Sequence, residues 1–204
     1  MIYIIPAIIL AYLLGSIPTA YIFGKVLKGI DIRRHGSGNV GATNVFRTVG
    51  KVEGIIVLVI DFLKGLIAVT LIPFYLAKFL PEPLAYYHFN ILIFLGAAAV
   101  CGHIWTVFLG FKGGKGVATM AGVVAGLSLA VLFACLGVWM LVFAIWRYVS
   151  LASIVVAVIL PIFAIAFGSD LYFLIFCAIF SIIGIYRHRE NIKRLIQGTE
   201  KKLL

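Results

Sequence analysis

The chain alternates long apolar segments with short polar ones. The apolar runs cover residues 2–24, 54–80, 86–110, 117–146, 151–167 and 171–186. Most of them reach or approach the ~20 residues that an α-helix needs to cross the roughly 30 Å hydrocarbon core of a membrane. The pattern therefore predicts an all-α fold, a polytopic integral membrane helical bundle.

One apolar run is too long for a single crossing. As one helix, residues 117–146 would measure about 45 Å, against a core of about 30 Å. Gly122, Gly126 and Ser128 lie near its middle and favour a bend. We therefore predict two helices, at about 117–128 and 130–147, of which the first is short for a full crossing. This division predicts about seven membrane segments, some of them short.

The composition supports a membrane protein. Of the 204 residues, 64% are hydrophobic and 12% are charged, whereas about 25% are charged in soluble domains. This excludes an ordinary soluble globule, a disordered chain and a coiled coil. The first apolar run lacks a basic region and a clean cleavage site, so we interpret it as a retained helix and not a signal peptide. We expect residues 1–204 to form a single integral membrane domain.

The charges predict the orientation of the chain. Lys and Arg number 17 against 7 Asp and Glu, and they concentrate in residues 25–53, 111–116 and 187–204. Such segments stay in the cytoplasm. The PEP turn at 81–83 and the GSD turn at 168–170 each carry only an acidic residue, so we place them outside. If residues 117–146 cross twice, every basic segment falls on the cytoplasmic side, with the N-terminus outside and the C-terminus cytoplasmic. The cytoplasmic motif loops are then about 31–51, 102–119 and 187–194.

The first cytoplasmic loop is rich in glycine and hydrogen-bonding side chains. Gly36, Gly38 and Gly41 match G-x-G-x-x-G, but no strand precedes them, which excludes a dinucleotide-binding fingerprint. Glycines still let backbone N–H groups approach an anion. The loop adds neutral donors and a two-pronged cation: Ser37, Asn39, Thr43, Asn44 and Arg47. The alternative is a glycine-rich loop with a helix cap.

The second loop contains the sequence KGGKG at residues 112–116. It suggests a phosphate cradle, although Gly116 stands where a P-loop needs Ser or Thr, and no carboxylate nearby would hold magnesium. The alternative is a basic turn between two helices. His103 lies in the preceding apolar run, where it is either part of the site or a hydrogen-bonded residue of the bundle interior.

The third stretch, RHRENIKR, spans residues 187–194. His188 and Asn191 share a face if the helix continues. The alternative is a basic helix end that meets anionic lipid and leads into an interfacial amphipathic helix. Asp61 and Lys64 are the only charges well inside an apolar run. They either pair as a structural feature or support the first loop from behind.

In this order, GSGNVGATNVFRTVGK, GHIWTVFLGFKGGKGVAT and HRENIKRL resemble the three cytoplasmic motifs of the bacterial acyl-phosphate:glycerol-3-phosphate 1-O-acyltransferases, the PlsY type. The resemblance covers the whole chain in length, topology and motif order. It implies transfer of a fatty acyl group from acyl phosphate to glycerol 3-phosphate, giving lysophosphatidic acid and phosphate, the first acylation step of phospholipid synthesis. It also implies the bacterial cytoplasmic (inner) membrane, an active site facing the cytoplasm, and no metal, cofactor, acyl-CoA or nucleic acid.

The resemblance also implies roles for individual residues. The candidate catalytic residues are Ser37, Asn39, Arg47, His188 and Asn191. The candidate substrate-binding and phosphate-binding residues are Gly38, Thr43, Asn44, His103, Lys112, Gly113, Gly114, Lys115, Gly116, Thr119 and Glu190. Because acyl phosphate is an activated donor, we expect direct attack without an acyl-enzyme on Ser37. The general base is open between His188, His103 and a substrate phosphate.

Two other functions are weighed against this one. Acyltransferases with His-x-x-x-x-Asp are excluded, because the residues five positions after the four histidines are Val40, Ile93, Phe108 and Lys193. A membrane transporter of an anionic phosphorylated solute is the alternative. It would need substrate groups near the membrane midplane, commonly in two similar halves, whereas here the polar residues crowd one side and no internal repeat is visible. Acyl chain length and oligomeric state are not readable from the sequence.

Overall fold

The computed structural model describes residues 3–79 and 88–203, and all regular structure in these residues is helical. The predicted all-α fold is therefore confirmed. By internal packing the chain divides into two compact units, Met1–Leu127 and Ser128–Leu204, and each is described by itself. The predicted turn at 81–83 lies outside the described residues. The single membrane domain remains a prediction.

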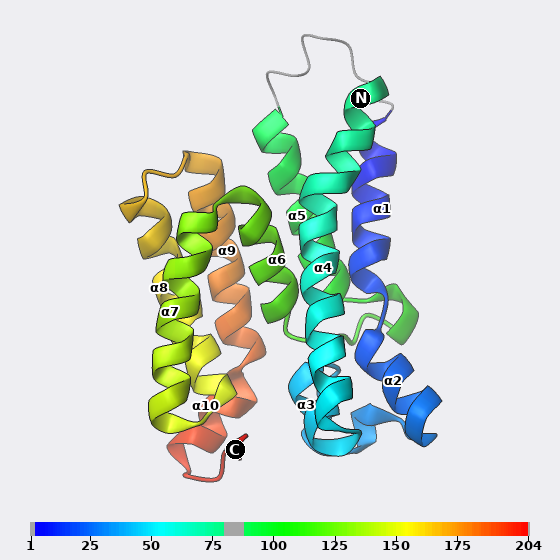
Figure 1. The fold of residues 1–204 in the computed structure, drawn as a ribbon, viewed down its shortest axis with the longest axis vertical. Coiled ribbons are helices and arrows are strands. Elements are labelled where there is room, and N and C mark those ends of the chain that lie inside the picture. Colours follow the sequence, from blue (N-terminus) through cyan, green and yellow to red (C-terminus); the bar gives the residue numbers. More distant parts are fainter. Residues whose placement is uncertain (1–2, 80–87, 204) are drawn as a thin grey trace. The chain divides into compact units, whose positions relative to one another are not determined.

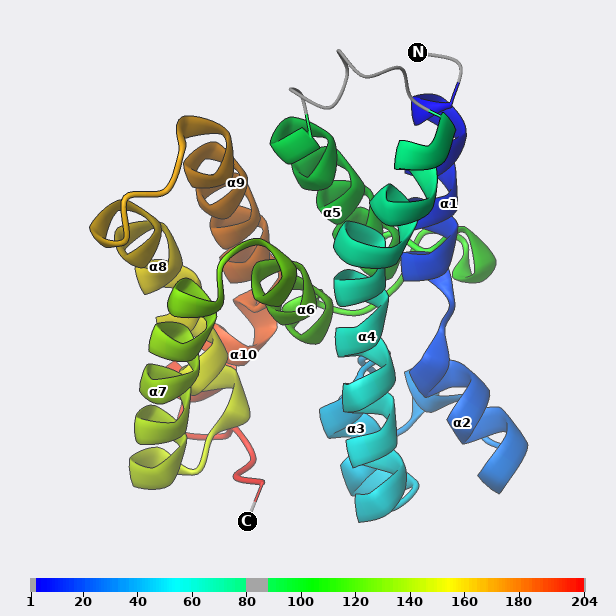
Figure 2. The same ribbon diagram turned by 45° about the horizontal axis from the view of Figure 1, so that its top comes forward.

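The first unit is built around α4, its longest helix. Its elements are α1 (Ile4–Ser16), α2 (Thr19–Lys28), α3 (Ala42–Thr48), α4 (Lys51–Leu76), α5 (His88–Ile104) and α6 (Val117–Leu127), with short 3-10 turns η1 (Ile32–Arg34), η2 (Ala77–Phe79) and η4 (Val107–Leu109). Helix α1 packs along α5, and α4 packs against α6, α5, α3 and α1 (Figures 1 and 2). The described loops at residues 29–41 and 105–116 connect these helices and carry the first two motifs.

Small residues let these helices approach to backbone contact. A Cβ atom on Gly15 of α1 would overlap the carbonyl of Ala99 on α5. A Cβ atom on Gly122 of α6 would overlap the carbonyl of Phe62 on α4. Interfaces of this kind are typical of membrane helices, which gain their association from close packing and not from the hydrophobic effect. The packing holds α1, α4, α5 and α6 as one scaffold beneath the two loops.

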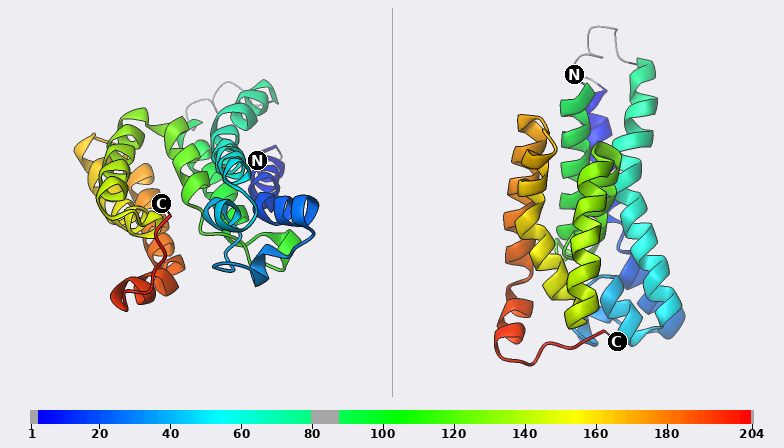
Figure 3. Two further views of the ribbon diagram at one scale, coloured as in Figure 1. Left: turned by 60° about the horizontal axis from the view of Figure 1, so that its bottom comes forward. Right: turned by 60° about the vertical axis from the view of Figure 1, so that its left-hand side comes forward.

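The second unit contains four helices. They are α7 (Leu129–Trp146), α8 (Val149–Ala166), α9 (Leu171–Arg187) and α10 (Arg189–Ile196), and α8 packs against both α7 and α9. Asp170 caps α9 by accepting hydrogen bonds from the backbone N–H groups of Tyr172 and Phe173. The chain bends by 55° between α9 and α10, and the right-hand view of Figure 3 shows the C-terminal segment turning back after α10.

Helix length and composition agree with a multi-pass membrane protein. The described residues contain five helical stretches that are long and apolar enough to cross a membrane, or six if α9 and α10 count as one span. Helix α6 is a further, shorter apolar helix of 11 residues. The predicted break inside 117–146 is confirmed, because α6 ends at Leu127 and Ser128 caps α7 through its side chain. The bend itself lies at Ser128, whereas Gly122 and Gly126 lie inside α6 and serve its packing.

The first span differs from the continuous helix predicted over residues 2–24. Helix α1 ends at Ser16 and α2 begins at Thr19. Pro18 explains the break, because proline has no N–H to continue the helical hydrogen bonds and its ring disfavours a helical residue before it. Helix α2 then runs to Lys28 with Val26 and Leu27 exposed.

Candidate active site

The first motif folds around the buried side chain of Asn44, which is 1% exposed. Its Oδ1 accepts a hydrogen bond from the backbone N–H of Ser37 at 3.0 Å. Its Nδ2 donates toward the backbone carbonyls of Ile32, His35 and Asn39 at 3.0–3.1 Å. One amide side chain therefore holds together four points of the loop that precedes it.

This geometry gives Asn44 a supporting position in the loop, while its predicted binding role stays a prediction. Its amide hydrogens point at carbonyls of the loop itself. Gly36, with a φ of 61°, has no room for a side chain, because a Cβ atom there would overlap Oδ1 of Asn44. Gly38, at φ 72°, adopts a second left-handed turn, which glycine does at little cost. The glycine pattern is thus explained by the turns of the loop.

The other polar residues of the first motif are more accessible. Ser37 is exposed, and its Oγ accepts a hydrogen bond from the backbone N–H of Asn39 at 3.4 Å. Asn39, Thr43 and Arg47 are half-buried, the last two on α3. The loop therefore presents a hydroxyl group on a backbone that Asn44 holds in place.

An ion pair fixes the start of this loop. The Arg33 guanidinium donates to both carboxylate oxygens of Asp31, from Nε at 3.0 and 3.2 Å and from Nη2 at 2.7 Å. The hydrogen bond from Arg33 holds the pKa of the Asp31 carboxyl at about 2. The charge of Arg33 is therefore matched within the loop, so the attraction of this region for an anion depends more on its other cations.

The second motif is fixed to the C-terminal end of α5. The backbone N–H groups of Gly113 and Gly114 donate to the carbonyls of Ile104 and His103, at 3.1 and 3.0 Å. These groups complete the end of the helix, and the phosphate cradle expected at this loop stays a prediction. A Cβ atom on Gly114 would overlap the His103 ring and lie 2.7 Å from the carbonyl oxygen of Val40. The two glycines are needed because the second loop packs this closely against α5 and against the first motif.

The two lysines of this motif lie on either side of the buried glycines. Lys112 is exposed and Lys115 is half-buried, while Gly116 takes a φ of 82° just before α6. Thr106, at the start of the loop, donates to the carbonyl of Ser16 at 2.5 Å and ties the loop to the end of α1. The first unit thus brings the first and second predicted motifs together.

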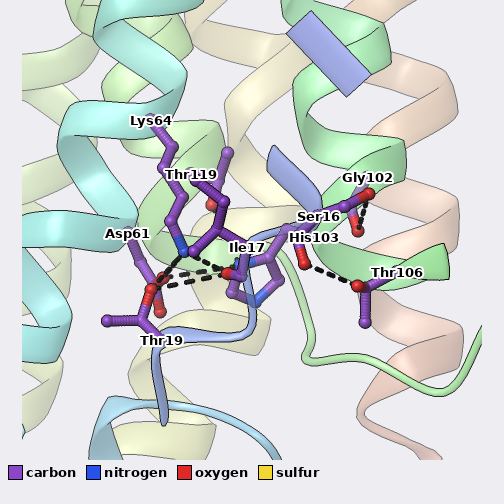
Figure 4. A network of polar contacts seen from close by, with 9 residues as sticks. All are labelled: Ser16, Ile17, Thr19, Asp61, Lys64, Gly102, His103, Thr106 and Thr119. Carbon is purple, nitrogen blue, oxygen red and sulfur yellow. Dashed lines mark hydrogen bonds and ion pairs between the residues drawn. The ribbon is translucent and has the colours of Figure 1, made fainter. Parts of the chain in front are cut away.

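Beneath these loops lies a buried polar network that the sequence indicated only in part (Figure 4). Lys64 donates to Asp61 Oδ1 and to the carbonyl of Ile17, both at 2.6 Å, and to the hydroxyl of Thr19. Asp61 and Lys64 are each 3% exposed. Lys64 therefore also donates to the Ile17 carbonyl, which has no helical partner because the chain breaks between α1 and α2.

His103 joins this network to the second motif. Its Nδ1 lies 3.2 Å from the hydroxyl of Thr119 and 3.9 Å from Asp61 Oδ1. Thr119 is fully buried and lies against the His103 ring, and its predicted part in substrate binding stays a prediction. A small polar cavity at this point offers about 10 Å³ to the centres of water molecules, room for roughly one water. One sequence signal pointed here, namely the charged pair inside an apolar run. Pro18, which ends the first helix, is a second signal in the sequence that was missed.

The third motif lies in the second unit, at the bend between α9 and α10. His188 is 3% exposed and its Nδ1 lies 2.8 Å from the carbonyl of Gly184. Asn191 is 8% exposed, and its Nδ2 donates to Glu200 Oε1 at 2.7 Å. Glu190 differs from both, since its side chain is 68% exposed beside Arg189. Glu200 is a residue of this cluster that the sequence did not reveal.

The described residues offer no group of three His, Cys, Asp or Glu side chains that could hold a metal ion. Cys101, Cys135 and Cys177 are unpaired thiols.

Comparison with known proteins gives one consistent result. The family model "Glycerol-3-phosphate acyltransferase" matches residues 5–198. A glycerol-3-phosphate acyltransferase 2 of Moorella thermoacetica is 45% identical over 97% of this chain and 96% of its own length. A glycerol-3-phosphate acyltransferase of Parasynechococcus marenigrum is 45% identical over 95% of this chain and 87% of its own.

Solved structures agree with these relatives. A crystal structure of PlsY (YgiH), an integral membrane glycerol 3-phosphate acyltransferase in its glycerol 3-phosphate form, is 42% identical, with a TM-score of 0.86 over 98% of this chain and 94% of that one. The lysophosphatidic acid form of PlsY gives a TM-score of 0.82 at the same identity and coverage. The family that the three motifs resemble is thus confirmed, and this chain belongs to the PlsY-type glycerol-3-phosphate acyltransferases.

Proposed function

We propose that this membrane enzyme transfers a fatty acyl group from acyl phosphate to the 1-hydroxyl of glycerol 3-phosphate, giving lysophosphatidic acid and inorganic phosphate. The observation that carries the proposal is the match over 98% of the chain to a structure of PlsY in its glycerol 3-phosphate form. Acyl phosphate as the donor is supported by the resemblance of the three motifs.

The reaction needs little covalent help from the protein. The acceptor hydroxyl oxygen attacks the carbonyl carbon of the acyl phosphate, and a new ester bond forms. The bond from that carbon to the phosphate oxygen breaks, phosphate leaves with the electron pair, and the hydroxyl proton passes to a base. Because the donor is already activated, positioning of the two substrates and stabilisation of negative charge account for the catalysis.

The residues of the first unit fall into two groups, those that we expect to contact a substrate and those that hold the loop backbones in place. We assign Ser37, Asn39 and Arg47 to the acyl phosphate, and the exposed Lys112 with Lys115 to glycerol 3-phosphate. This division is favoured because other groups already hold the backbones of both loops: Asn44 holds the first loop and the end of α5 holds the second. Preorganised loops of this kind hold charged groups in place before the substrate arrives.

We assign the third motif to the same reaction on its resemblance to the family motif. Nδ1 of His188 lies 2.8 Å from the carbonyl of Gly184, which can only accept a hydrogen bond. When the ring is neutral, its proton is therefore on Nδ1 and Nε2 is the basic nitrogen. The candidates for accepting the hydroxyl proton are His188, His103 and a phosphate oxygen of a substrate. If His188 is the base, we expect His188→Gln to lose most of kcat and also the fall in rate at low pH, which is the acid limb of the pH–rate profile. With a phosphate as the base, the acid limb persists in this variant.

The proposed orientation places the motif loops on the cytoplasmic side of the membrane. The support is the excess of Lys and Arg in the loops that carry the motifs. Glycerol 3-phosphate is a soluble anion, whereas the acyl chain belongs in the bilayer. A bundle whose polar loops face the cytosol gives each substrate access from its own phase.

The direct test combines the purified enzyme in detergent with palmitoyl phosphate and labelled glycerol 3-phosphate. We expect equal amounts of labelled lysophosphatidic acid and phosphate, and no product when palmitoyl-CoA replaces the acyl phosphate. Lack of product from folded protein would contradict the proposal and favour the transporter. Uptake of labelled glycerol 3-phosphate into proteoliposomes would then be the measurement.

A second test addresses the absence of an acyl-enzyme. The enzyme is incubated with labelled palmitoyl phosphate without acceptor, denatured and separated from free lipid. We expect no label on the protein. Label that is present in the wild type and missing in Ser37→Ala would replace direct attack with a covalent route.

A further inference from the structure

The segment after α10 folds back onto the start of α8. The backbone N–H groups of Thr199 and Glu200 donate to the carbonyl of Arg194, at 2.8 and 3.2 Å. Further along, the N–H of Leu203 donates to the carbonyl of Arg147 at 3.1 Å, and the ammonium group of Lys202 lies 5.7 Å from the centre of the Tyr148 ring. The segment is therefore attached at both ends, with Glu200 between them.

Glu200 uses its position to join three side chains. Its carboxylate, 5% exposed, accepts hydrogen bonds at Oε1 from Ser150 Oγ and Asn191 Nδ2, both at 2.7 Å. Its Oε2 accepts from Arg194 Nε at 2.6 Å. Burial by itself would raise the pKa of Glu200, but these hydrogen bonds and the charge of Arg194 outweigh it and lower the pKa. The carboxylate is thus ionised at neutral pH and acts only as an acceptor.

We infer that Glu200 is a positioning residue, which orients the side-chain amide of Asn191 for the acyl transfer. An ionised carboxylate accepts hydrogen bonds and donates none, so it pairs with the nitrogen end of the amide and excludes the oxygen end. The carbonyl oxygen of Asn191 must then point away from Glu200. The inference rests on the proposed function, in which Asn191 takes part in the reaction.

The carboxylate of Glu200 links two helices of the second unit. Ser150 belongs to α8, while Asn191 and Arg194 belong to α10. The carboxylate therefore holds the orientation of Asn191 relative to α8, which a residue within α10 alone would not do.

A double-mutant cycle separates positioning from general stabilisation. We compare wild type, Glu200→Ala, Asn191→Ala and the double variant for lysophosphatidic acid formation, with long incubations that keep the slow variants measurable. We expect Glu200→Ala to lower kcat about tenfold, the loss that corresponds to one hydrogen bond to a charged group, with a smaller change in KM for glycerol 3-phosphate. In the Asn191→Ala background the same substitution should cause no further loss.

Two further variants complete the design. Glu200→Gln keeps an oxygen for the Asn191 amide and should recover part of kcat. Gln197→Ala changes an exposed side chain of the same segment and should match the wild type. Thermal unfolding and gel filtration in detergent establish that each variant is folded. If Glu200→Ala does not fold, Glu200→Gln in both backgrounds provides the same cycle.

The outcomes distinguish the inference from the proposal beneath it. An equal loss from the Glu200 substitution in both backgrounds, or no loss in the wild-type background, overturns the positioning role. Full activity in Asn191→Ala removes Asn191 from the reaction and overturns the inference, while the acyl transfer itself stands. Lack of product from the folded wild type is instead the failure of the proposed function.

Discussion

At the scale of single residues, burial separates the polar groups that are open to solvent from those that bond within the protein. Asn44 and Thr119 have side chains suited to binding phosphate, but they are 1% and 0% exposed and bond within the protein. Ser37 and Lys112 have comparable chemistry and are exposed. A motif therefore mixes two roles that only the fold separates.

Asn44 provides a direct test of the supporting role. Asn44→Ala removes the donors to three carbonyls and the acceptor for Ser37 N–H, and each buried group left without a partner costs about 1–3 kcal/mol. We expect faster hydrogen exchange in residues 31–49 and at least a tenfold loss of acyl transfer. Exchange is measured by mass spectrometry in detergent.

A matched control is Thr70→Ala, a polar-to-alanine change at an exposed position of α4. It should leave both the exchange of the loop and the activity unchanged. Loss of activity in Asn44→Ala without faster exchange would return Asn44 to a ligand-contacting role.

At the scale of elements, each break between helices has its own physical cause. Pro18 ends α1, and Ser128 separates α6 from α7. The first break leaves a carbonyl at Ile17, and the buried Lys64 on α4 bonds to it. The Asp61–Lys64 pair thus joins the broken first span to α4.

Removing one member of this pair should be costly. Lys64→Met leaves the buried Asp61 without its ammonium partner and takes one donor away from the Ile17 carbonyl, so we expect a loss of about 3–5 kcal/mol in the free energy of unfolding. The measurement is a denaturant titration in micelles. The double variant Asp61→Asn, Lys64→Met removes the isolated charge and should lose less. An equal or greater loss in the double variant would contradict this account.

Glycines in the helices offer a second test at this scale. Gly122→Ala places a methyl group against backbone atoms of Phe62 and Leu66 on α4, which forces α4 and α6 apart at a cost of about 1–3 kcal/mol. Gly137→Ala on α7 is the matched control, because nothing lies within 4 Å of its added Cβ. The midpoint of thermal unfolding should fall for Gly122→Ala alone. Equal midpoints would show that the helices separate without cost.

At the scale of the whole molecule, the chain is an integral membrane protein that crosses the bilayer several times. Large apolar side chains remain exposed along its long helices, including Phe133, Leu141 and Ile145 on α7 and Ile5 and Ile9 on α1. A soluble protein would bury most such residues, whereas lipid accepts them.

The predicted orientation is tested by labelling single cysteines. With Cys101, Cys135 and Cys177 replaced by Ala, we expect Tyr148→Cys to react with a membrane-impermeant maleimide only from the cytoplasmic side. Ser169→Cys should react only from the outside. The physical reason is the basic Arg147 beside the first position and the acidic Asp170 beside the second. Labelling of residue 148 only from outside would contradict the double crossing of 117–146.

The sequence by itself determined the membrane class, the long apolar helical segments, the break near residue 128 and the family. These features follow from local information: apolar length sets a span, a serine caps a helix, and a motif is a run of neighbouring residues. The tertiary structure alone decided which polar residues hold the loops, why Lys64 is buried, and that Glu200 reaches Ser150 and Asn191. Such contacts join residues far apart in the chain, and a hydrogen bond depends on where the fold places its two partners and not on their spacing in sequence.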